Sequence, residues 1–311
     1  MSAASEQDPR EILHEPRETN FNPDLQSRYR VDKFFKVVSW VATFSGIVVL
    51  AVLLIGILVS GLSSLDFEFI TSPPSRRPEE AGIWPALIGT VYLLIITALV
   101  CFPIGVGSGI FLEEFASDNL FTKIVEINIS NLAAVPSIIY GMLGLFVFAR
   151  IFEPLTGGRS IISGALTLAL LILPVIIVAT REALRAVPDS LRLAGMALGS
   201  TRWQTVRSHV LPQAIPGIMT GTILALSRAI GETAPLIVVG AATFVPFAPE
   251  FSLDGLRSSF TAMPIQIFSW VGRPQDGFHA IAASAIIVLM LLLFVMNGTA
   301  IWLRNKFQRS L

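Results

Sequence analysis

The chain has 311 residues, of which 53% are apolar and 14% are charged, and its 22 Lys and Arg residues balance 22 Asp and Glu residues. Soluble domains carry about 25% charged residues, so this composition is typical of a protein mostly immersed in lipid, and the zero net charge gives no indication of a nucleic-acid partner. The one cysteine, Cys101, excludes an internal disulfide and any site built from several cysteines, and the three histidines show no metal-ligand spacing.

The first residues differ sharply from the rest of the chain. Residues 1–33 are polar, rich in charge, Asn and Ser, and without periodicity, so we interpret them as a mostly disordered cytoplasmic tail. Residues 34–311 are expected to form one all-α integral membrane domain. A membrane helix needs roughly 20 apolar residues. We find six candidate spans, at 37–62, 84–111, 131–152, 160–180, 215–247 and 279–303.

Prolines mark three of these spans. Pro136 and Pro174 lie within the third and fourth spans, and membrane helices tolerate proline better than soluble ones do. The fifth span is too long for one straight crossing, so it is predicted to bend at a proline.

The distribution of Lys and Arg predicts the orientation of the bundle. With the N-terminus in the cytoplasm, fifteen of the 22 basic residues fall inside, six fall outside, and Arg228 falls within a span. Cytoplasmic loops carry such an excess, so both termini and the loop between the fourth and fifth spans are expected inside. Outside, 71–82 is a proline-rich connector. The apolar segment 260–274 is expected as a helix that lies at the outer surface or folds back against the bundle.

The cytoplasmic loop 181–217 is expected to contain two short helices. Pro188 and Asp189 suit the first turn of a helix, and Gly199 stands where a left-handed C-terminal cap would be. The capping-box pattern at 201–204 predicts the start of the second helix.

This second helix is expected to end at Pro212 and Pro216, which lead into the fifth span. An apolar stripe with spacings of 4, 3 and 4 residues is expected along the first helix. Its members are Val187, Leu191, Ala194 and Leu198. An apolar face on a loop in water needs a partner, which is the bundle itself, the lipid headgroups or another protein.

The stretch 187–218 resembles the EAA loop of ABC importer permeases. The positions that match the family pattern are Ala194, Gly199, Leu211 and Pro212, whereas Leu193 stands where the family usually has Glu. In that family the loop is the coupling helix that docks into a groove of the ATPase subunit. The resemblance therefore implies an ATPase-coupling surface, with Asp189, Leu191, Ala194, Leu198 and Gly199 as its residues.

Other segments extend the resemblance to the phosphate-specific permeases. They cover 82–94, 131–148, 227–236 and 260–270, and the last two are more similar to the A-type subunit (PstA) than to its C-type partner. The resemblance implies a type I ABC importer permease bundle in a prokaryotic inner or plasma membrane, with phosphate as its cargo.

Three protein partners follow from the same resemblance. They are a homologous PstC-type permease, a dimer of PstB-type ATPase subunits and an extracytoplasmic PstS-type phosphate-binding protein. The chain has no GxxxxGK[ST] loop, so ATP and Mg are expected on the ATPase. This chain is expected to need no cofactor and not to be an enzyme by itself.

The stretch LALSRAIGETAPLIVVG, 224–240, places Arg228 and Glu232 inside an apolar span. A charge at the centre of a membrane costs about 2.5–3.5 kcal/mol on translocon scales, so it needs a partner or a watery cavity. Residues four apart share one face of a helix. Gly231 and Pro235 predict a weak point in the helix beside Glu232.

Two interpretations of this pair remain open. It is either a buried ion pair that pins the fifth span to its neighbours, or part of the substrate path, with the fork of Arg228 facing phosphate oxygens and Glu232 as its counter-charge. The resemblance favours the second interpretation. Arg181, at the cytoplasmic end of the fourth span, is either an exit-side contact of the same path or a positive-inside anchor.

Three rival functions remain. The first is a permease for another oxyanion such as molybdate or sulfate. The second is a secondary transporter with a proton relay through Arg228 and Glu232, and the third is a membrane scaffold without transport.

Overall fold

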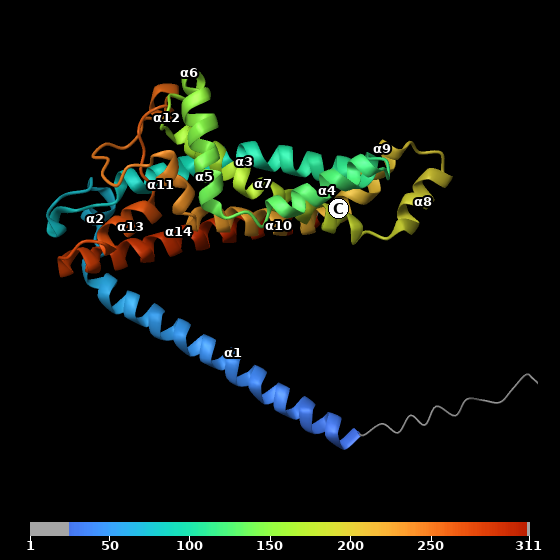
Figure 1. Cartoon of the computed structure of the whole chain (residues 1–311), viewed down its shortest axis with the longest axis horizontal. Helices are drawn as coiled ribbons and strands as arrows, with labels where there is room; N and C mark the ends of the chain where they lie inside the picture. The colour runs from blue at the N-terminus through green and yellow to red at the C-terminus, as the bar shows by residue number, and fades with distance from the viewer. Residues whose placement is uncertain (1–24, 310–311) are drawn as a thin grey trace, which may run out of the picture. The chain divides into compact units, whose positions relative to one another are not determined.

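The computed structural model describes residues 25–309, and every regular element within them is helical (Figure 1). The chain divides into two units, residues 1–54 and 55–311, which are described separately. The first unit holds most of α1 (Leu25–Gly61), whose apolar side chains are exposed, as lipid contact requires.

Because α1 begins at Leu25, the expected tail is wrong for residues 25–33. Leu, Gln, Arg and Lys in that stretch are good helix formers, and a helix already nucleated by the apolar run extends through them at little cost. The expectation for residues 1–24 lies outside the described residues.

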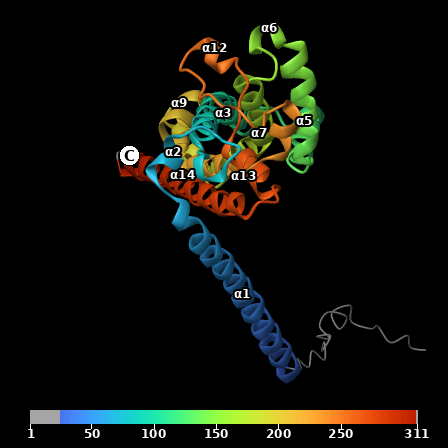
Figure 2. The ribbon, with the colours of Figure 1, turned by 90° about the vertical axis from the view of Figure 1, so that its left-hand side faces the viewer.

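The second unit is a helical bundle built on four long helices. They are α3 (Trp84–Ile110), α7 (Ile161–Arg185), α10 (Leu211–Gly231) and α14 (Asp276–Arg309), which run side by side (Figures 1 and 2). The π-helical turn η3 (Phe111–Phe115) extends α3, and α4 (Leu120–Leu132) and α5 (Ser137–Phe146) follow it.

Short elements connect these helices. Towards one end of the bundle, α8 (Asp189–Ala197) and α9 (Arg202–Thr205) form the loop between α7 and α10 (Figure 1). The others are η1 (Leu62–Ser64), α2 (Phe67–Thr71), η2 (Pro78–Glu80), η4 (Val147–Ile151), α6 (Glu153–Thr156), η5 (Val206–Val210), α11 (Ala234–Val239), α12 (Leu253–Leu256) and α13 (Met263–Val271).

Among residues 25–309, five helices are long and apolar enough to cross a membrane, and a bent pair makes six if it counts as one span. This agrees with the six expected spans and the all-α class. The bent pair corrects the third span. Instead of one helix over 131–152, α4 and 137–151 meet at 105°. Pro136 stands at this break, because its ring disfavours helical backbone in the residue before it.

The prolines near the fifth span act differently from the prediction. Pro212 and Pro216 do not end the second loop helix, which continues from Arg202 to Gly231. The wider π-helical turn η5 ends two residues before Pro212 and lets the backbone pass a residue without an N–H. The C-terminal part of the fifth span is shorter than expected. The helix stops at Gly231, and after a two-residue break only the short helix α11 follows.

Close helix contacts rest on small residues. A Cβ built on Gly217 of α10 would lie 2.8 Å from the Cβ of Ala183 in α7, and one on Gly141 of α5 would lie 2.7 Å from the Cα of Pro235. Membrane helices associate through such small-residue contacts, where backbones approach closely. Of the two arrangements expected for 260–274, the structure has the one folded back against the bundle, since Trp270 of α13 is fully buried.

The orientation stays a prediction that labelling can test. In a Cys101→Ala background, an impermeant maleimide added to intact cells should label Arg76→Cys and should label Ser190→Cys only after the membranes are opened. Both positions are exposed. The background protein alone serves as the control. Labelling of position 190 in intact cells would contradict the assignment of α8 to the cytoplasm.

Candidate functional site

The structure brings Arg228 and Glu232 together. The Nε atom of Arg228 donates to Oε1 of Glu232 at 3.2 Å, and the two side chains are 51% and 19% exposed. Arg228 lies in the last turn of α10, three residues before the helix ends, where the negative end of the helix dipole favours a cation. The ion pair stays within one segment and does not bridge α10 to a neighbouring helix.

Glu232 follows the end of α10 in extended backbone, with φ −79° and ψ 104°. Gly231 is the last helical residue before it, and Pro235 is buried in the first turn of α11 after it. Pro235 lacks an N–H and its ring clashes with the carbonyl four residues earlier, so one continuous helix through this point is unfavourable. Glu232 thus stands at a break rather than in the middle of a span.

A second candidate region is the loop between α7 and α10. The caps have the geometry that local rules require. Gly199 has φ 85°, and the side chain of Thr201 and that of Gln204 form both hydrogen bonds of a capping box. A Cβ built on Gly195 would lie only 2.8 Å from the Cγ2 of Thr205, so the two loop helices touch at a residue without a side chain.

The expected apolar stripe does not form one face. Val187 is buried and Leu191 packs with it beneath the bundle, whereas Ala194 and Leu198 are exposed. The reason is that Val187 precedes α8 and Leu198 caps it. The first and last residues of the stripe therefore lie outside the helix that would align them. The exposed apolar face, called the α8 face below, consists of Leu193, Met196 and Leu198, which are 64%, 47% and 88% exposed.

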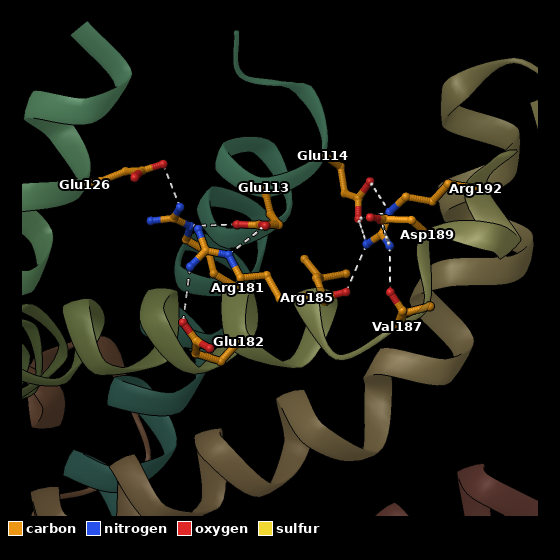
Figure 3. A network of polar contacts seen from close by, with 10 residues as sticks. Glu113, Glu114, Glu126, Arg181, Glu182, Arg185, Val187, Asp189 and Arg192 are labelled. Carbon is orange, nitrogen blue, oxygen red and sulfur yellow. Dashed lines mark hydrogen bonds and ion pairs between the residues drawn. The ribbon is translucent and has the colours of Figure 1, made fainter. Parts of the chain in front are cut away.

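Arg181 lies in an ion-pair network of its own, apart from the pair on α10. Its Nε donates to Oε2 of Glu113 at 3.1 Å and its Nη2 to Oε1 of Glu126 at 2.6 Å (Figure 3). Arg181 is only 7% exposed. Glu113 also accepts from Arg185, one turn further along α7, at 2.8 Å. A buried charge needs such partners, because unpaired burial is costly.

The neighbouring carboxylate, Glu114, holds the loop helix. It is 3% exposed and accepts from Nη2 of Arg192 on α8 at 2.6 Å. Arg192 also donates to the carbonyl oxygen of Leu184 in the last turn of α7 at 2.9 Å, to that of Val187 just after α7 at 2.8 Å, and to Asp189 at 3.1 Å. The hydrogen bond with Glu114 raises the pKa of Arg192 above its ordinary value despite its burial, so Arg192 stays charged at physiological pH.

Sequence reasoning missed the three carboxylates, Glu113, Glu114 and Glu126. Two signals could have found them: adjacent glutamates directly after an apolar span, and Arg181 and Arg185 four apart on one helix face. Among the described residues there is no group of three or more His, Cys, Asp or Glu placed to hold a metal ion.

Comparison with known proteins gives consistent similarities. A family model described as "Binding-protein-dependent transport system inner membrane component" matches residues 102–309. YqgI of Bacillus subtilis (strain 168), named a probable ABC transporter permease protein, is 37% identical over 85% of this chain and 92% of its own. The phosphate transport system permease protein PstA 1 of Mycobacterium tuberculosis (strain CDC 1551 / Oshkosh) is 32% identical over 73% of this chain and 72% of its own.

Solved structures show the same fold. A bacterial alginate ABC transporter, in complex with an alginate-bound periplasmic protein, has a chain with a TM-score of 0.65 and 14% identity, covering 92% of this chain and 99% of that chain. The methionine ABC transporter MetNI, in an inward-facing conformation, has a chain with a TM-score of 0.52 and 18% identity, covering 73% and 94%.

Proposed function

This chain belongs to the family of binding-protein-dependent transport system inner membrane components, and we propose that it is the A-type permease subunit of an ATP-driven phosphate importer. The sequence relatives named PstA support phosphate as the cargo. The structural neighbours act on alginate and methionine, so the fold alone does not select a cargo. In this proposal a homologous permease supplies the other half of the path, and a binding protein delivers phosphate from outside.

The open guanidinium of Arg228 is the observation that carries the proposal. Glu232 engages only its Nε atom, and within residues 25–309 neither terminal nitrogen has a hydrogen-bond partner. Arg228 is nevertheless on the surface of a membrane-spanning helix, where a charge facing hydrocarbon is unfavourable. This face of α10 therefore suits a water-filled path between subunits, and a planar fork of donors suits phosphate oxygens.

Glu232 has a complementary role in this proposal. It neutralises Arg228 when the path is empty and weakens the hold on a bound anion. The break between α10 and α11 gives Glu232 backbone freedom that a helical residue lacks, so the pair can separate as the bundle moves. Phosphate is then held between the terminal nitrogens of Arg228 and groups of the second permease.

ATP hydrolysis belongs to separate subunits in this proposal. The α8 face is the surface that docks them, because three apolar side chains exposed on a loop in water are stabilised by an apolar groove on a partner. ATP and Mg are bound by that ATPase dimer and not by this chain. Arg181, which is already paired with two carboxylates, is assigned to the shape of the bundle rather than to contact with phosphate.

Transport assays with the complete complex test the function. Liposomes that contain both permeases and the ATPase should take up phosphate only when ATP is inside and the binding protein is outside. An ATPase with its phosphate-loop lysine replaced is the matched control and should give no uptake. Phosphate uptake driven by a proton gradient without ATP would contradict the proposal in favour of a secondary transporter.

The remaining rivals have their own outcomes in the same assay. Uptake of molybdate or sulfate in preference to phosphate would identify a permease for another oxyanion. Full uptake by a complex that lacks this chain would identify a scaffold.

A further inference from the structure

We propose that the two adjacent glutamates of η3 hold α8 against the ends of α3 and α7 and, through Arg181, against the middle of α4, so that these four segments move as one rigid block. This inference rests on the proposed function, because it concerns how movement of α8 would reach the substrate path. Glu114 and Arg192 are the positioning residues of the block, and neither is proposed to touch phosphate or ATP.

The two glutamates point to different partners. Figure 3 shows Glu113 directed at Arg181 and Arg185 of α7, and Glu114 directed at Arg192 of α8. One short π-helical turn therefore holds two helices at once. Because Glu114 is 3% exposed, separation of α8 from η3 would leave a buried carboxylate without its partner.

Arg192 also joins α8 directly to the end of α7. Its guanidinium donates to the carbonyl oxygen of Leu184, which lies in the last turn of α7 where carbonyls lack helical N–H partners, and to that of Val187 just after the helix. A rotation of α8 about its axis would break these bonds and the bond to Glu114 together. The planar fork of arginine allows all of them in one conformation, which the single ammonium of lysine does not.

The block continues towards Arg228 and Glu232 through α4. Arg181 links Glu113 to Glu126 of α4. The hydroxyl of Tyr140 in α5 donates to the carbonyl oxygen of Leu132 at the end of α4, at 2.8 Å. Gly141, the next residue, lies against Pro235.

Pro235 follows Glu232 by three residues. A continuous series of ion pairs, hydrogen bonds and packing contacts thus connects α8 to the helix break beside Glu232. Movement of α8 can therefore be transmitted to that break, whereas a flexible loop would not transmit it.

Spin labels in the assembled complex test the rigid block without reference to cargo. The labels go on Ser190→Cys in α8 and Leu120→Cys in α4, both exposed, in a Cys101→Ala background. The distance between them should be the same with and without ATP bound to the ATPase subunits. In the double variant Glu114→Gln with Arg192→Gln, which leaves no buried unpaired charge, this distance should become ATP-dependent or broad.

A transport measurement accompanies the distances. The ATP hydrolysed per phosphate imported should rise by about tenfold in the double variant, within the usual range for coupling between sites. The control is Arg77→Gln with Glu80→Gln, which removes an exposed ion pair in the segment between α2 and α3. It should change neither the distance between the spin labels nor the ATP hydrolysed per phosphate. Arg192→Lys should fall between the parent and the double variant.

Three results would overturn the proposal. They are a parent distance that itself changes with ATP, a double variant that keeps the parent's distance and ATP ratio, and failure of both the double and the Arg192→Lys variants to assemble. The last result would make the pair a requirement of folding rather than of transmission. A parent complex that hydrolyses ATP but imports no phosphate would instead contradict the proposed cargo. The distances between the spin labels would still show whether α8 and α4 move as one rigid block.

Discussion

Replacing Arg228 by lysine should lower phosphate uptake by about 10- to 100-fold while the amount of assembled complex stays unchanged. Lysine keeps the positive charge beside Glu232 but loses the fork, whose two terminal nitrogens have no hydrogen-bond partner among residues 25–309. The loss of one hydrogen bond to a charged group costs about 1.5–3 kcal/mol, which corresponds to that range. The measurement is phosphate uptake by liposomes, normalised to complex recovered by affinity purification.

A matched control and a charge exchange separate recognition from structure. Arg77→Lys alters another exposed arginine that is ion-paired with a nearby glutamate, here Glu80 through Nη1, and it should leave uptake unchanged. Exchange of the two charges, Arg228→Glu with Glu232→Arg, keeps an ion pair at this position but moves the guanidinium beyond the end of α10. If the exchange and the lysine variants both transport at the parent rate, the pair is structural and the proposed path is wrong.

Replacing Leu198 by glutamate should abolish recovery of the ATPase subunit with this chain and reduce uptake to background. Leu198 is 88% exposed and caps α8, so the substitution disturbs no packing within the chain. A carboxylate in an apolar docking face has to be desolvated, and changes at the few residues that dominate an interface cost about 2 kcal/mol or more. Co-purification from detergent and ATP-driven uptake measure the two effects.

Leu253→Glu is the control for this substitution. Leu253 is 73% exposed in α12, an element outside the loop between α7 and α10, and the variant should assemble and transport like the parent. Normal recovery of the ATPase with Leu198→Glu would show that the α8 face is not its docking surface, whatever the effect on uptake.

The loop between α7 and α10 was partly predictable from short-range sequence patterns. The left-handed backbone of Gly199 and the capping box at 201–204 were both predicted from residue type and spacing. These features depend on a few adjacent residues, whose sterics and hydrogen bonds are the same in any fold. The stripe through Val187 and Leu198 was predicted by the same kind of spacing and is wrong as one face. It assumed a helix longer than α8, and the position of the bundle decided which of its members were buried.

The breaks in the membrane helices were only partly predictable. Proline types are visible in the sequence, but Pro136 stands at a sharp bend, Pro174 lies inside α7 and Pro212 follows a π-helical turn. The missing N–H is common to all three. Each proline leaves a backbone carbonyl without its helical N–H partner. Whether neighbouring helices or a widened turn can accommodate that carbonyl differs among the three sites and depends on packing.

The membrane class, the six apolar segments, the caps of the loop and the pairing of Arg228 with Glu232 all follow from the order of residues alone. Each depends on hydropathy over one span or on residues at most four apart, so local physical chemistry decides it. The network of Glu113, Glu114 and Glu126 instead required the folded chain. Glu113 lies 68 residues from Arg181, and Glu114 lies 78 residues from Arg192. Which buried charges meet depends on which helices are neighbours, and close packing of small residues, such as Gly217 against Ala183, helps to set that arrangement within residues 55–309.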